Sequence, residues 1–166
     1  MANEEAKYDV VKSNETYEIR KYSDRLAVQA LNTNENNSFR KLFNYISGDN
    51  ETNEEIKMTI PVTQMENKGN MTMQFYLPSK FNKDNVPYPS SSDVKIVNIE
   101  GGYYAVIRYS GRASNKNFIK HKEILENELK KNNISISGSA IKASYNSPFT
   151  LPMLKRNEAM FKVNWK

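Results

Sequence analysis

Few side chains in this sequence are suited to acid–base or metal chemistry. The chain has no cysteine and one histidine, His121. Thiolate nucleophiles, disulfides, zinc–cysteine sites and iron–sulfur ligation are excluded, and a Ser-His-Asp triad or a multi-histidine metal centre is disfavoured. A carboxylate, Glu158, and a phenol, Tyr145, could exchange a proton in a buried pocket. Arg156 lies close by in the sequence, and its charge favours the ionised carboxylate, which weakens the case for a general acid.

Length and composition predict one folded domain over residues 1–166. The chain is 38% hydrophobic and 26% charged, so it can bury a core of its own. Its 24 basic and 19 acidic residues give a net charge of +5, but they are interspersed, which argues against a nucleic-acid partner. No stretch approaches the roughly 20 apolar residues of a membrane span, and the first residues do not resemble a signal peptide. We therefore expect a cytoplasmic protein without membrane insertion.

The elements of the first half follow from the spacing of apolar residues. Side chains alternate over residues 16–31, which predicts a hairpin with its turn at 23–24. Ser38 and the asparagines before it are suited to cap a helix, and Gly48 is suited to end it. Four apolar residues follow the i, i+3, i+4, i+7 pattern of one helical face: Phe39, Leu42, Phe43 and Ile46. Residues 56–64, with a break at Pro61, and 71–77 read as strands.

The second half repeats this order of elements. Strands are expected at 94–99, 103–109, 139–145 and 160–165, and a helix from the capping Ser114 to about residue 132. Each half therefore reads as strand, strand, helix, strand, strand. This pattern predicts an α+β protein in which pseudo-duplicated halves form a distorted antiparallel β-barrel or curved sheet flanked by two helices.

Several motifs, taken together and in order, resemble the SOUL haem-binding family. They are YEIRKY at 17–22, FNYISG at 43–48, KMTIPV at 57–62, YNSPFTLP at 145–152 and RNE at 156–158. The resemblance covers nearly the whole chain. It implies a two-fold pseudo-repeat around a distorted antiparallel barrel. It also implies that haem, or a related tetrapyrrole, binds non-covalently in an apolar cleft between the first helix and the proline-rich loop before the last strand.

Carried onto this chain, the resemblance implies a set of residues that line the cleft. From the helix and the following strand these are Phe39, Leu42, Phe43, Ile46, Met58 and Ile60, and from the loop they are Tyr145, Phe149 and Met153. Lys155 and Arg156 supply cations for the two propionates, as a flat apolar ring with carboxylates at one edge requires. The same helix residues have the spacing that packing into an ordinary hydrophobic core requires, so a purely structural role is an alternative. The RNE motif could likewise serve only to pin the loop to the sheet.

The sequence leaves the iron ligand unassigned. His121 falls at the border of the apolar face of the second helix, away from the implied cleft, where a histidine is more often part of the core edge. Tyr145, Met58 and Met153 offer oxygen or sulfur ligands of kinds that other haem proteins use. No spacing favours one of them.

We expect a soluble haem or tetrapyrrole carrier or buffer, without turnover and without assigned catalytic residues. The small-molecule tetrapyrrole is the expected partner, and a protein that accepts haem from it is a further one. One alternative is a GyrI-like effector-binding protein or hydrolase that uses a pocket Glu158 or Tyr145. Another is an interaction protein that docks through the exposed loop at 145–153.

Overall fold

The computed structural model describes residues 3–32, 35–67 and 69–166, which form two compact units. The first unit consists of Met1–Ala6 and Asp24–Glu100, and the second of Lys7–Ser23 and Gly101–Lys166. Each unit is therefore assembled from separate stretches of the chain. No helix in the described part of the chain is long and apolar enough to cross a bilayer.

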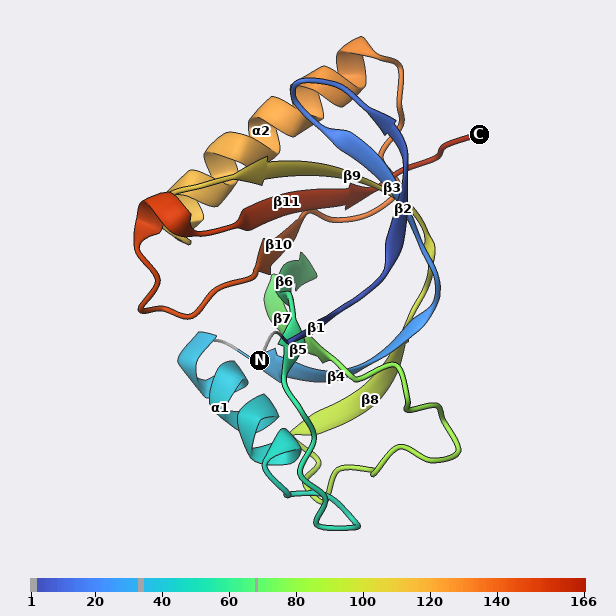
Figure 1. Cartoon of the computed structure of the whole chain (residues 1–166), viewed down its shortest axis with the longest axis vertical. Helices are drawn as coiled ribbons and strands as arrows, with labels where there is room; N and C mark the ends of the chain where they lie inside the picture. Colours follow the sequence, from blue (N-terminus) through green and yellow to red (C-terminus); the bar gives the residue numbers. More distant parts are fainter. Residues whose placement is uncertain (1–2, 33–34, 68) are drawn as a thin grey trace. The chain divides into compact units, whose positions relative to one another are not determined.

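The first unit packs one helix on a four-stranded antiparallel sheet of order β6-β7-β4-β8, with a short parallel pair β1-β5 beside it in the fold (Figure 1). Helix α1 contributes Leu42, Tyr45 and Ile46 to a core that includes Val28 and Phe75 of the sheet. The elements are β1 (Glu4–Glu5), β4 (Arg25–Asn32), α1 (Glu35–Ile46), β5 (Thr59–Ile60), β6 (Val62–Asn67), β7 (Asn70–Tyr76) and β8 (Val94–Ile99).

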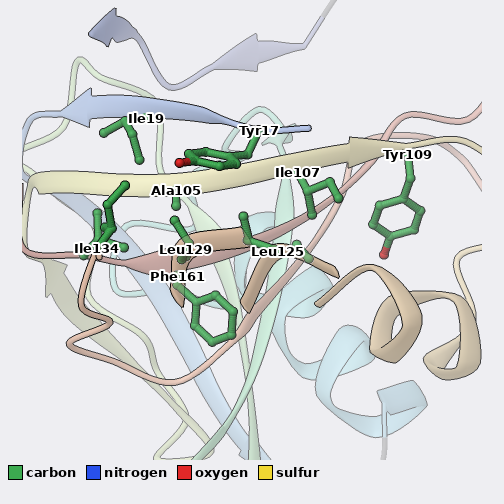
Figure 2. Close-up of a cluster of buried hydrophobic side chains, with 11 residues drawn as sticks. Tyr17, Ile19, Ala105, Ile107, Tyr109, Leu125, Leu129, Ile134 and Phe161 are labelled. Atoms are coloured by element: carbon green, nitrogen blue, oxygen red, sulfur yellow. The ribbon is translucent and has the colours of Figure 1, made fainter. Parts of the chain in front are cut away.

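The second unit packs helix α2 on a five-stranded antiparallel sheet of order β2-β3-β9-β11-β10. Leu125 and Leu129 of α2 are fully buried against strand residues such as Ile19 and Phe161 (Figure 2). The helix begins at its predicted cap, since Ser114 accepts a hydrogen bond from the Asn117 amide. The elements are β2 (Tyr8–Ser13), β3 (Glu18–Tyr22), β9 (Gly102–Tyr109), α2 (Asn115–Lys131), β10 (Ile141–Ser144), the short 3-10 helix η1 (Pro152–Leu154) and β11 (Asn157–Lys162).

The predicted α+β class and the repeated order of elements are confirmed. The first half of the sequence runs β3-β4-α1-β6-β7, with the short β5 before β6, and the second runs β8-β9-α2-β10-β11. The predicted hairpin over residues 16–31 is wrong. Strand β3 pairs with β2 and β9, whereas β4 pairs with β7 and β8, so the chain leaves one unit for the other at Ser23. Alternating side chains indicate a strand but not its partner, and Ser-Asp is not a favoured two-residue hairpin turn.

Two predicted boundaries also differ from the structure. Helix α1 already runs from Glu35, so Ser38 lies inside it and is buried instead of capping it, and Asn34 lies outside the described residues. Gly48, after the helix, adopts the positive φ of 124° that favours glycine at a helix end. Strand β11 begins at Asn157, three residues before the predicted start at residue 160. Glu158 is therefore part of a strand and not of the preceding loop.

Candidate functional site

A buried ion pair lies on the sheet of the second unit. Arg20 of β3 donates from Nη1 to Oε1 and from Nη2 to Oε2 of Glu158 in β11, both at 2.8 Å. The Arg20 side chain is 2% exposed and that of Glu158 is 0% exposed. Neighbouring residues of these strands, Ile19 and Phe161, belong to the core beneath α2. Since side chains alternate along a strand, the pair projects from the opposite face of the sheet.

Two more side chains complete what we call the Glu158 cluster, which consists of Arg20, Tyr145, Arg156 and Glu158. The Tyr145 hydroxyl donates a short hydrogen bond to Oε1 of Glu158. Arg156 Nε donates to Oε2 at 3.2 Å, and its guanidinium lies 3.8 Å from the centre of the Tyr145 ring. Arg156 and Glu158 of the RNE motif are therefore in direct contact with each other.

The surroundings of Glu158 keep it ionised. Burial alone would raise its pKa, but the hydrogen bonds and charge of Arg20, with help from Tyr145 and Arg156, outweigh burial and hold the pKa below its usual range. Burial and the neighbouring Glu158 carboxylate raise the pKa of the Tyr145 hydroxyl, so that group keeps its proton. A carboxylate with four donor contacts is a poor proton donor and a poor base. The cluster therefore acts as a structural ion pair with its hydrogen bonds satisfied.

The residues predicted on and after the first helix divide into core and surface. Leu42 and Ile46 are buried in the core of the first unit, Met58 packs against that core, and Ile60 is half-buried in β5. Phe39 and Phe43 are 42% and 50% exposed. The four apolar positions of the helix therefore do not share one environment.

The two exposed phenylalanines of α1 form an aromatic surface that is accessible to a ligand. The rings of Phe39 and Phe43 are stacked, with centroids 6.2 Å apart and planes 14° from parallel. Phe39 also packs edge-on against Phe75 of β7, at 5.3 Å between centroids, which holds its ring in place. A flat apolar ligand can contact such a pair without disturbing the core below it.

The proline-rich loop of the second unit exposes a second apolar surface. We use "apolar loop" for residues 147–154, which end in η1. Its large apolar side chains are all exposed: Phe149 at 95%, Leu151 at 60%, Met153 at 77% and Leu154 at 67%. Tyr145 is buried at the base of the loop, while Lys155 and Arg156 are half-buried just beyond it. Helix α1 and the apolar loop belong to different units, so the cleft expected between them stays a prediction.

His121 lies within helix α2, as predicted. Its Nδ1 is 2.8 Å from the carbonyl oxygen of Asn117, one turn earlier. Its ring stacks on Tyr109 with centroids 4.0 Å apart and planes within 3° of parallel. These contacts are those of a residue at the edge of the core. Within residues 3–32, 35–67 and 69–166, His, Cys, Asp and Glu form no group of three that could hold a metal ion.

Sequence reasoning missed Arg20 as a partner of the site. The alternation over 17–22 places Glu18, Arg20 and Tyr22 on one side of β3, and a polar face of this kind is normally solvated. In the structure Arg20 and Tyr22 are buried, and Arg20 also donates to Glu18 at 2.7 Å. The available signal was a charged residue, Arg20, between Tyr17 and Tyr22 in a strand, which is consistent with a buried charge. The residues near Arg20 in the sequence give no indication that Glu158 is its partner.

The arrangement of elements is shared with proteins of known structure. The C-terminal domain of EcmrR superposes with a TM-score of 0.68 at 10% identity, over 96% of this chain and 99% of that chain. A hydrolase from Listeria innocua superposes with a TM-score of 0.63 at 10% identity, over 93% of this chain and 94% of that chain. At such identities the likeness establishes the α+β fold and nothing about function.

Sequence comparison identifies the family within that class. The family model described as SOUL heme-binding protein matches residues 3–162, so the chain belongs to this family. Heme-binding protein 2 of Mus musculus is 31% identical, over 89% of this chain and 78% of that protein. The resemblance noted from the motifs is thereby confirmed.

Proposed function

We propose that this protein binds haem, or a related tetrapyrrole, non-covalently and carries or buffers it without turnover. The observation that carries this proposal is the match to the SOUL heme-binding protein family over residues 3–162. The mouse relative named for haem binding supports it. The exposed aromatic and apolar side chains described above, with cations beside one of them, supply the chemistry such a ligand needs.

The residues present fit the ring and the propionates of haem. The stacked Phe39 and Phe43 offer one apolar face, and the apolar loop offers Phe149 and Met153 as another. Lys155 follows the loop directly and can pair with a propionate. We propose, as the family resemblance implies, that both elements contribute to binding, and variants in each element test this separately.

Axial ligation through Tyr145 does not fit the contacts of this residue. The Tyr145 hydroxyl is buried, donates to Glu158 and has a raised pKa, so it is not available as a phenolate ligand. His121 lies on α2, where its ring stacks on Tyr109, whereas the family resemblance implies a site at α1 and the apolar loop. We propose that apolar contact and propionate pairing are the main forces that hold the ligand, with Met58 and Met153 as the remaining candidates for an iron ligand.

Apolar contact alone can supply a useful affinity. Burial of about 600 Å² of apolar surface at about 25 cal/mol per Å² contributes about 15 kcal/mol. Loss of translational and rotational freedom opposes this by about 4 to 10 kcal/mol. The net binding free energy that is left corresponds to a range of dissociation constants that includes one micromolar. Such an affinity suits reversible carriage.

The alternative of an effector-binding protein or hydrolase depends on the Glu158 cluster. Such chemistry needs Glu158 or Tyr145 to exchange a proton with a ligand or to pair with a charged group of the ligand. Glu158 is instead saturated by Arg20, Tyr145 and Arg156. This saturation favours the carrier over the hydrolase, although both share the fold.

The test is a titration of the purified haem-free protein with haemin, followed by absorption. We expect a saturable Soret change that ends at one haemin per chain. Phe43→Ala and, separately, Phe149→Ala should weaken binding several-fold, because each exposes the ring to more water. Val10→Ala, which shortens an exposed side chain of β2, is the matched control and should leave binding unchanged. A change that does not saturate, or equal behaviour of all variants, would contradict the proposal.

A further inference from the structure

The apolar loop exposes more hydrophobic surface than a solvated loop requires. Scattered single apolar residues are ordinary on a protein surface, but adjoining ones mark an interaction site. Phe149, Leu151, Met153 and Leu154 lie within six residues, and all are more than half exposed. Phe149 at 95% exposure makes almost no contact with its own chain.

The loop is held in place at its base and does not hang freely. The Gly111 amide donates to the Pro152 carbonyl at 2.8 Å, and Asn157 Nδ2 donates to the Gly111 carbonyl at 2.9 Å. The Arg156 amide donates to Asn146 Oδ1 at 2.6 Å, which closes the loop on itself. Figure 1 shows the red η1 segment beside the amino-terminal end of α2. The apolar side chains are therefore presented on a fixed frame next to the segment that leads into α2.

These two adjoining segments carry charge of one sign. Residues 110–122 and 145–157 contain no aspartate and no glutamate, whereas acidic residues are common elsewhere in the chain. Their cations are Arg112, Lys116, Lys120, Lys122, Lys155 and Arg156. Arg112, Lys116 and Lys120 are exposed, and Lys122 and Lys155 are half-buried. The exposed apolar side chains thus lie near a group of cations that includes the exposed Arg112, Lys116 and Lys120 and the half-buried Lys155, whereas Arg156 is paired with Glu158 and the exposed Glu123 follows Lys122.

We propose that the apolar loop docks shallowly on the surface of an anionic phospholipid bilayer. Apolar side chains gain free energy at the boundary of headgroups and acyl chains, and Lys and Arg gain from anionic headgroups. The loop offers both together, and its fixed base means that little ordering is needed on docking. Such contact needs no membrane-spanning segment. It goes beyond haem binding and is a property of the haem-free protein, because the proposed haem site uses Phe149 and Met153 of the same loop.

The charge pattern favours a bilayer over a second copy of this chain. A symmetric dimer through the loop would bring its cations against the same cations of the partner, which is unfavourable. An anionic lipid surface complements the charge and receives the apolar side chains at the same time. Self-association is therefore an outcome that the test must be able to reveal.

The test is co-sedimentation of the haem-free full chain with vesicles. We expect at least tenfold tighter binding to phosphatidylcholine vesicles with about 30% phosphatidylserine than to phosphatidylcholine alone, and weakening by added salt. Phe149→Ser combined with Met153→Ser should reduce binding at least tenfold. Val10→Ser combined with Val11→Ser, which alters exposed side chains of β2 in the same unit, is the matched control and should not. Equal binding to both vesicle types, or no effect of the loop variant, would overturn the proposal.

A second measurement locates the contact. In the Phe149→Trp variant, vesicles with brominated acyl chains should quench fluorescence strongly, whereas Trp165 in the unchanged chain should be little affected. Sedimentation velocity without vesicles should show a monomer for the unchanged chain and for the variant that combines Phe149→Ser with Met153→Ser. A dimer of the unchanged chain that is absent in this variant would overturn the proposal in favour of self-association. Because no haem is present, failure here leaves the haemin titration as an independent test of the proposed function.

Discussion

Arg20 and Glu158 form a fully buried, two-point ion pair between strands β3 and β11, although they are 138 positions apart in the chain. Nη1 and Nη2 of Arg20 each lie 2.8 Å from one carboxylate oxygen of Glu158. Tyr145 and Arg156 take further positions around the carboxylate. Removal of either ion would leave the other buried without its two-point partner, with only Glu18 beside Arg20 or Arg156 and Tyr145 beside Glu158, which is less favourable than the loss of a surface pair.

We predict that Arg20→Ala or Glu158→Gln lowers the free energy of unfolding by about 3 to 5 kcal/mol. Denaturant titration of each variant measures this loss. The matched control is Glu128→Gln, which removes the exposed pair with Lys131 and should lower stability by less than about 1 kcal/mol. Replacement of both buried partners, as Arg20→Met with Glu158→Leu, should be less harmful than the sum of the single variants. Losses as small as the control's would show that the pair does not stabilise the fold.

A second prediction concerns pH. The folded state holds the pKa of Glu158 below the ordinary value of about 4.3, so the folded protein binds this proton less readily than the unfolded chain. The contribution to stability is therefore complete above the ordinary value and is lost as pH falls towards the folded pKa. Unfolding free energies of the unchanged chain and of Glu158→Gln, measured from pH 7 to pH 3, should draw closer together as pH falls below the ordinary carboxyl pKa. A constant difference between them would contradict the lowered pKa.

A third prediction concerns the propionates. Lys155→Gln should weaken binding of haemin several-fold and barely change binding of its dimethyl ester, because only the free acid carries charges to pair. Parallel absorption titrations with the two ligands measure this. Lys155 is the sharper site for the test, since Arg156 also contacts Glu158 and its loss would disturb the cluster. Equal losses for both ligands would remove the propionate role.

A fourth prediction concerns the single histidine. His121→Ala should leave the Soret spectrum of the haemin complex unchanged, because the family resemblance implies a site at α1 and the apolar loop and not on the face of α2 where His121 stacks on Tyr109. It should lower thermal stability modestly through the lost stacking on Tyr109. Absorption spectra and melting curves of the same samples separate the two effects. A spectrum lost only in His121→Ala would place the site on α2.

The elements of this protein could be read largely from local patterns. Ser114 is suited to cap a helix, and α2 begins directly after it. The family motifs, spread from Tyr17 to Glu158, identified the SOUL family, which the family model confirms. Periodicity and capping depend on neighbours within a turn or a strand, so the sequence alone suffices for them.

The pairing of strands and the burial of polar groups were decided only by the tertiary structure. Residues 16–31 alternate as a hairpin would, yet β3 and β4 join different units. Phe39 and Leu42 are both apolar helix residues, yet one is exposed and the other is core. The local sequence predicts that Arg20 is a solvated strand residue, but in the structure Arg20 is buried because it pairs with Glu158, which is distant in the sequence. A side chain's environment depends on partners distant in sequence, and local spacing carries no information about them.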